Sequence, residues 1–252
     1  MATAKSLGKR TAAFFCLGSC LFSAQARALP VRLLADNAYA QLVPGKPASA
    51  SPATPPPRLS PRVLYQEEVV LQNSDRRTKL RFYSDEDPRN PPLWFRAWDQ
   101  ERPVDAFREE APEELARLGE RNGHPVLNAW VIPMVFEIRE TKRIRIQAEY
   151  PVLPLASRPK TDRFEIYFSR WGWQPSNPDL LFRFDIGPMI STIPCLGRPP
   201  TPALLPWLLS SWFTLQPAGY QTRGFTAWWR FRAAGEPERC EKICVEWYAW
   251  YR

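Results

Sequence analysis

Between residues 180 and 186 the chain alternates strictly between two kinds of side chain. Polar or smaller positions, including Arg183 and Asp185, separate four large apolar residues: Leu180, Phe182, Phe184 and Ile186. Successive side chains of a β-strand point to opposite faces, so this spacing predicts a strand with one buried face. On periodicity alone it is an ordinary core strand.

Six further segments are strand-like and are separated by turn signals: 62–72, 78–83, 93–98, 131–138, 141–150 and 163–171. One helix is predicted over 105–122, where Pro112 opens a first turn and Asn122-Gly123 ends it. The chain has 28 prolines against 11 glycines, and proline breaks helix interiors, so long helices are not expected. Seven short strands in this order predict an all-β antiparallel sandwich.

The first 28 residues resemble an export signal. Lys5, Lys9 and Arg10 precede the short apolar run 11–22, and small residues near position 28 suit cleavage. Residues 29–61, rich in proline, alanine and serine toward their end, are interpreted as a flexible linker. The protein is therefore expected outside the cytoplasm. The alternative is a lipoprotein that is acylated at Cys20.

The net charge is +8, and it falls to +4 without the four basic residues of the first 28 positions. Basic residues alternate with apolar ones, as in Arg143-Ile144-Arg145-Ile146, which is typical of the solvated face of a strand. This pattern favours an ordinary charged surface over a nucleic-acid-binding one.

Residues that carry chemistry are sparse. His124 is the single histidine, beside a turn, and the chain has no Cys-x-x-Cys pair, phosphate-binding loop or Gly-x-Ser-x-Gly motif. Glu67 and Glu68 are neighbours in a strand, so they point to opposite faces and cannot act as a local acid–base pair. A non-enzyme without cofactor, metal or small-molecule substrate is expected. A carbohydrate-active protein stays open as an alternative, because the eleven tryptophans suit sugar stacking.

From residue 61 to 200 the order of these segments resembles the PapD-like periplasmic chaperones that assemble pili, with features of their archaic branch. The segments that carry the resemblance are 61–65, 93–98, 132–138, 143–146, Leu153-Pro154, 162–165 and Arg198-Pro199. The resemblance implies an immunoglobulin-like sandwich of seven strands over 62–199. It also implies a periplasmic chaperone that binds pilin subunits and delivers them to an outer-membrane usher. The alternative is a secreted or lipid-anchored β-sandwich with an adhesive or structural role.

In that family an edge strand of the chaperone inserts alternating apolar side chains into the open groove of a pilin subunit. The resemblance assigns this role to four residues: Leu180, Phe182, Phe184 and Ile186. It assigns the anchoring of the subunit's C-terminal carboxylate to Arg62, whose planar guanidinium suits a carboxylate. The second basic anchor of better-known members is replaced here by Pro194.

Residues 200–252 are too few for the family's second domain and are expected to form a short, incomplete β domain. The alternative is a degraded terminus. The strand-like runs of this segment are 225–232 and 243–251. Between them Cys240 and Cys244 are close in sequence and, in an oxidising compartment, are candidates for a disulfide.

Overall fold

The computed structural model describes residues 31–45, 61–121, 123, 125–158, 160–169, 179–190, 192, 203, 207, 211–232 and 240–251. The signal segment 1–28, both of its cysteines and the Ile193-Pro194 and Arg198-Pro199 pairs lie outside these residues. None of the described helices is both long and apolar enough to cross a membrane.

The described chain is mostly β, as the sequence predicts. In chain order its elements are β1 (Val31–Val43), β2 (Arg62–Asn73), β3 (Thr78–Glu86), β4 (Trp94–Asp99), β5 (Arg102–Val104), β6 (Phe107–Glu110), α1 (Glu113–Arg121), β7 (Asn128–Phe136), β8 (Thr141–Pro151), β9 (Leu153–Pro154), β10 (Thr161–Ser169), β11 (Asp179–Asp185), α2 (Gly187–Ile190), β12 (Phe213–Gln216), β13 (Gln221–Arg223), β14 (Thr226–Arg232) and β15 (Cys240–Tyr248).

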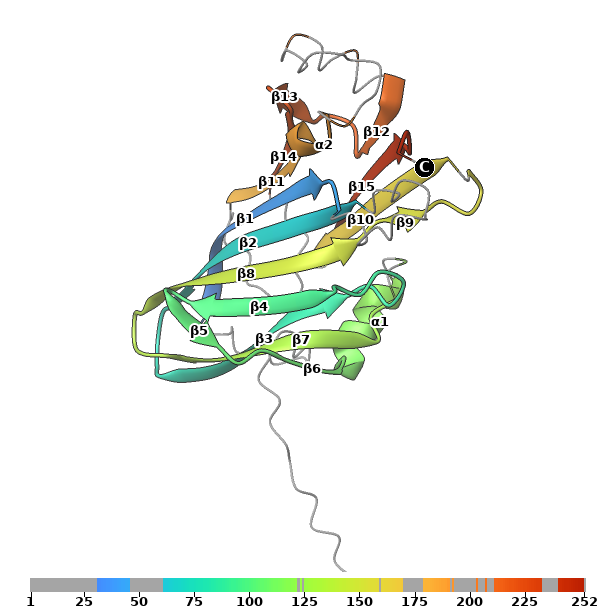
Figure 1. Ribbon diagram of the computed structural model, residues 1–252. Coiled ribbons are helices and arrows are strands. Elements are labelled where there is room, and N and C mark those ends of the chain that lie inside the picture. The colour runs from blue at the N-terminus through green and yellow to red at the C-terminus, as the bar shows by residue number, and fades with distance from the viewer. Residues whose placement is uncertain are drawn as a thin grey trace, which may run out of the picture.

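The strands form one large sheet and two small ones. Sheet A has eight strands in the order β13-β14-β11-β1-β2-β8-β4-β5, sheet B has the order β3-β7-β6, and sheet C has the order β12-β15-β10-β9. In Figure 1, sheet A runs from β13 and β14 near the top to β4 and β5 near the bottom. Its pairings are antiparallel except that of β1 with β11, which is parallel.

One hydrophobic core joins the three sheets. It contains inward-facing residues of sheet A such as Phe182 and Ile146, together with Phe136 of sheet B and Trp247 of sheet C. Ring contacts cross between sheets: Phe164 of β10 stacks on Phe184 of β11, with ring centroids 5.9 Å apart. Sheet A therefore buries one face against sheets B and C together.

The prediction of a linker over 29–61 is wrong for residues 31–43. These residues form β1, which lies in the middle of sheet A between β2 and β11. Apart from Asp36, its inward side chains are small or aliphatic, and Ala38, Ala40 and Leu42 are fully buried. Alanine contributes little to a hydrophobic pattern, which is why the sequence of this strand is weakly apolar.

The boundary predicted between residues 199 and 200 does not separate two folded units. β14 pairs with β11 in sheet A, and β15 pairs with β10 in sheet C. The large eight-stranded sheet with two smaller sheets also differs from the predicted seven-stranded sandwich. The predicted helix over 105–122 is shorter than expected, because residues 107–110 form β6 and pair with β7.

Candidate functional site

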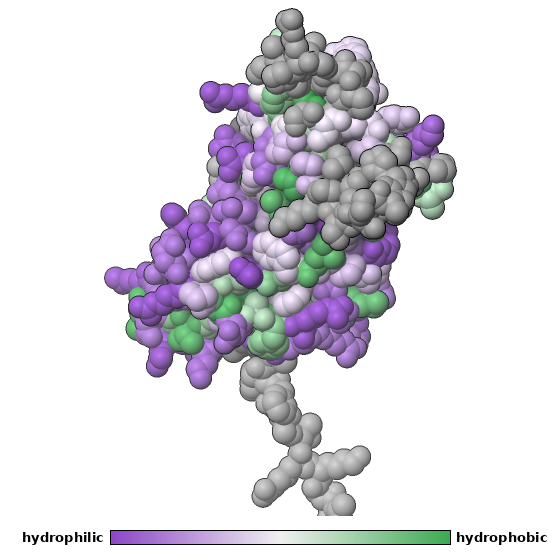
Figure 2. All heavy atoms as spheres, viewed as in Figure 1, coloured by the Kyte–Doolittle hydropathy of each residue, from purple (hydrophilic) through white to green (hydrophobic). Residues whose placement is uncertain are grey.

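The outer face of sheet A is the side that turns away from sheets B and C. Along β2 and β8, residues with inward side chains such as Val63 and Ile144 are fully buried, whereas alternate residues are half-buried or exposed. In the described part of the chain, no outer-face residue of β1, β2, β8 or β11 belongs to the core. Figure 2 shows a surface on which hydrophilic residues predominate, with small hydrophobic patches between them.

Strand register places six outer-face residues in one line across the middle of sheet A. We call this line the central row; from β14 to β4 it consists of Trp228, Arg183, Tyr39, Gln66, Gln147 and Arg96. Neighbouring strands lie about 4.8 Å apart, so the central row is about 24 Å long. All six residues are half-buried or exposed.

Parallel rows flank the central row on both sides. One flanking row runs from Trp98 through Arg145, Glu68, Asn37 and Leu181 to Arg230. The other runs from Trp94 through Glu149, Leu64, Gln41 and Asp185 to Thr226. The outer face thus combines aromatic rings, side-chain amides and arginines.

The aromatic rings of this face are held in place by polar neighbours. Trp94, 37% exposed, donates its Nε1–H to Glu149 Oε2 at 2.7 Å. The Tyr39 hydroxyl donates to Asp185 Oδ2 at 2.9 Å, and the Arg183 guanidinium lies 5.8 Å from the centre of the Tyr39 ring. Partial burial and the contact with Asp185 raise the pKa of Tyr39 to about 12, so its hydroxyl stays neutral.

The three carboxylates of these rows are engaged within the sheet. Glu149 forms an ion pair with Arg62 at 3.6 Å, and Glu68 forms one with Arg143 at 3.5 Å. Asp185 accepts hydrogen bonds from Tyr39 and from Gln41 Nε2, the latter at 3.0 Å. No ion pair between Arg96 or Arg183 and a carboxylate is found among the described residues; each lies beside an aromatic ring instead.

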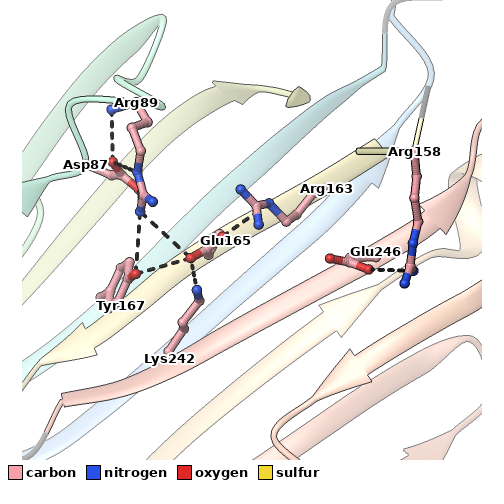
Figure 3. Close-up of polar contacts among 8 residues, drawn as sticks. All are labelled: Asp87, Arg89, Arg158, Arg163, Glu165, Tyr167, Lys242 and Glu246. Carbon is pink, nitrogen blue, oxygen red and sulfur yellow. Dashed lines mark hydrogen bonds and ion pairs between the residues drawn. The ribbon is translucent and has the colours of Figure 1, made fainter. Parts of the chain in front are cut away.

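A second polar cluster lies on the outer face of sheet C, around the buried carboxylate of Glu165 (Figure 3). Glu165 forms ion pairs with Arg163 at 3.2 Å, with Arg89 at 3.8 Å and with Lys242, and accepts a hydrogen bond from Tyr167 at 3.1 Å. Asp87 holds Arg89 in place. These groups interact with one another, so the cluster fastens the segment after β3 to sheet C.

The four residues predicted as a donated strand lie in the core of this protein. Leu180, Phe182 and Phe184 are 0% exposed and Ile186 is 1% exposed. β11 is not an edge strand, because it pairs with β1 on one side and β14 on the other. Their interpretation as groups that enter a partner is corrected accordingly: in this structure they pack against Phe164, Trp229 and other residues of the chain itself.

Arg62 lies at the start of β2, with its side chain on the outer face and about one-third exposed. Its partner there is Glu149, so the structure places it beside the site without bringing it to a carboxylate-binding cleft.

The predicted disulfide between Cys240 and Cys244 does not form. Both residues belong to β15, and four steps along an extended strand separate their Cα atoms by about 13 Å, too far for a disulfide. Cys244 is free and buried. Burial, together with the charge of nearby Glu165, raises the pKa of its thiol to about 11, so it is unreactive near neutral pH.

The candidate site residues that sequence reasoning missed are the aromatic and amide side chains of the outer face. The signal for some of them was present: Trp94, Arg96 and Trp98 stand at alternate positions of one predicted strand. Aromatic residues at wet positions of a strand indicate a binding surface, because a strand needs none there for packing. No group of histidine, cysteine or acidic residues that could hold a metal occurs within the described residues.

No family model matches the chain, and no curated protein matches it. Among solved structures it is similar to a candidate nutrient-binding protein of Legionella pneumophila, with a TM-score of 0.52, 12% identity, and coverage of 86% of this chain and 68% of that one. It is also similar to an M1 zinc metallopeptidase of Deinococcus radiodurans, with a TM-score of 0.39 and 9% identity, and spans 42% of that chain. The first likeness shows that this arrangement of strands occurs in a known protein.

Proposed function

We propose that this protein is a non-catalytic binding protein and that the outer face of sheet A holds an extended polysaccharide chain. The central row carries the proposal: it is a continuous line of aromatic, amide and guanidinium groups across six strands. A row of about 24 Å suits a ligand that is long and narrow.

The chemistry of the row suits sugars. The C–H faces of a pyranose ring are apolar and pack on aromatic rings, whereas the hydroxyls around its edge need donors and acceptors. Tyr39 and Trp228 supply rings, and Gln66 and Gln147 supply amides that both donate and accept. The sequence left open a carbohydrate-active protein. The outer face of sheet A supports that alternative as a protein that binds carbohydrate rather than one that cleaves it.

The proposal is tested by measuring the affinity of the full chain for a panel of polysaccharides by isothermal titration calorimetry. Tyr39→Ala and Trp228→Ala should each weaken binding about tenfold, corresponding to about 1.4 kcal/mol for one lost ring contact. The matched control is Tyr248→Ala, because Tyr248 is 45% exposed on the outer face of sheet C. Equal losses in all three variants, or no binding by the parent protein, would refute the proposal.

The pilus-chaperone hypothesis and its periplasmic location remain predictions. To donate β11 to a pilin subunit, the protein would have to release this strand from β1 and β14 and expose its core side chains. Purification with a pilin subunit would support that hypothesis. The outer face of sheet A offers a binding surface without such a rearrangement.

A further inference from the structure

The outer face of sheet A carries more positive than negative charge. Seven arginines lie in or beside its three rows: Arg62, Arg96, Arg143, Arg145, Arg183, Arg223 and Arg230. Arg62 and Arg143 pair with Glu149 and Glu68, and Arg145 lies 4.0 Å from Glu101. No ion pair of Arg96 or Arg183 with a carboxylate is found among the described residues, so the positive charge of these two is available to a ligand.

Two of the arginines stand in the central row itself, where an extended ligand would lie. Arg96 and Arg183 are exposed, and their guanidinium groups lie 5.6 Å from the Trp94 ring centre and 5.8 Å from the Tyr39 ring centre respectively. A guanidinium stacked on an aromatic ring keeps its in-plane N–H donors free for two parallel hydrogen bonds to a carboxylate. Each of these arginines can therefore bind a carboxylate beside an aromatic ring.

The spacing of the two anchors constrains the ligand. Arg183 on β11 and Arg96 on β4 are four strand spacings apart, or about 19 Å. A single small anion cannot reach both, so the ligand needs acidic groups at intervals along its length. Three amide or hydroxyl residues lie between the anchors: Tyr39, Gln66 and Gln147.

The flanking carboxylates argue against a densely charged polymer. Glu68 and Glu149 lie beside the central row, where they would repel a chain with a phosphate on every unit. They allow a polymer whose negative charges are spaced apart, because those charges can then contact the arginines instead of the carboxylates. This distinction favours a polysaccharide over single-stranded nucleic acid.

We infer that the outer face of sheet A selects polysaccharides that carry carboxylate groups, with Arg96 and Arg183 as the carboxylate anchors. This inference rests on the proposed function and adds the class of ligand to it. Binding to the acidic polymer should weaken as salt rises, because added ions screen exposed charges over about 10 Å at 0.1 M.

The experiment compares hyaluronate and gellan, whose carboxylates are separated by uncharged sugars, with their carboxyl-reduced forms, using the full chain and calorimetry. At least one acidic polymer should bind about tenfold or more tightly than its reduced form. Arg96→Gln and Arg183→Gln should each lower the affinity for the acidic polymer about fivefold more than they lower the affinity for its reduced form. Arg158→Gln is the matched control, since Arg158 is exposed and pairs with Glu246 on sheet C (Figure 3); thermal unfolding verifies that all variants fold.

Equal affinity for acidic and reduced polymers would overturn this inference and leave the proposed function standing. An absence of binding to either form would overturn both. Tighter binding to a single-stranded DNA oligonucleotide than to any acidic polysaccharide would also overturn both, because the face would then recognise phosphates.

Discussion

At the scale of single residues, the buried carboxylate of Glu165 has the strongest consequence for stability. Its side chain is 6% exposed and interacts with three cations. Glu165→Gln removes the negative charge and leaves the three positive groups close together. The variant should lose about 1–3 kcal/mol of unfolding free energy in urea.

The matched control for this prediction is Glu137→Gln. Glu137 pairs with Arg77 at 3.0 Å, but the two side chains are 63% and 68% exposed. An exposed ion pair contributes little, so this variant should lose less than about 0.5 kcal/mol. If both variants lost the same unfolding free energy, the ion pairs of Glu165 would contribute no more to stability than an exposed ion pair does.

Residue patterns in the sequence predicted which side chains are buried better than they predicted what those side chains do. The apolar alternation at Phe182 and Phe184 correctly indicated a buried face. The assignment of that face to a partner came from a resemblance, and the structure uses it in the protein's own core. The predicted disulfide between Cys240 and Cys244 was wrong for a geometric reason. Residues close in sequence can approach each other in a turn, but an extended strand holds them apart.

At the scale of elements, most strands were predictable because alternation depends only on local sequence. The pairing partners of each strand were not predictable, because they come from distant segments of the chain. β11 lies between β1 and β14, and the hydrogen bond from Tyr39 to Asp185 joins residues 146 positions apart. The central row, which needs the register of six strands, could not be assembled from any local pattern.

Phe184→Asp tests the place of β11 directly. The Phe184 ring is fully buried and stacks on Phe164, so the substitution removes core packing and places a carboxylate there. We expect a loss of about 4 kcal/mol or more, seen as an unfolded circular dichroism spectrum or a strongly lowered Tm. The neighbouring change Arg183→Gln, on the exposed face, should leave Tm nearly unchanged. A Phe184→Asp variant as stable as the parent would instead fit an exposed, donated strand.

At the scale of the whole molecule, the predicted division at residue 199 failed because composition does not report on pairing. The segment after residue 199 is short and rich in tryptophan, and by itself it suggests a reduced domain. In the structure its strands extend sheets that began more than 40 residues earlier: β14 extends sheet A, and β12 and β15 make up half of sheet C. Trp229 and Trp247 bury their rings in the common core.

This shared core predicts that residues 62–199 cannot fold by themselves. A fragment with these bounds lacks β1 from the middle of sheet A, and it lacks β15, the central pairing partner of β10. The edges of β2 and β11 that pair with β1, and the edge of β10 that pairs with β15, would then lose their backbone hydrogen-bond partners. We expect the fragment to show no cooperative thermal transition. The chain from residue 29 to residue 252 should unfold in one transition, with coincident near- and far-ultraviolet circular dichroism. Cooperative unfolding of the 62–199 fragment would mean that the sheets carry two separable cores, and the single core described above would be wrong.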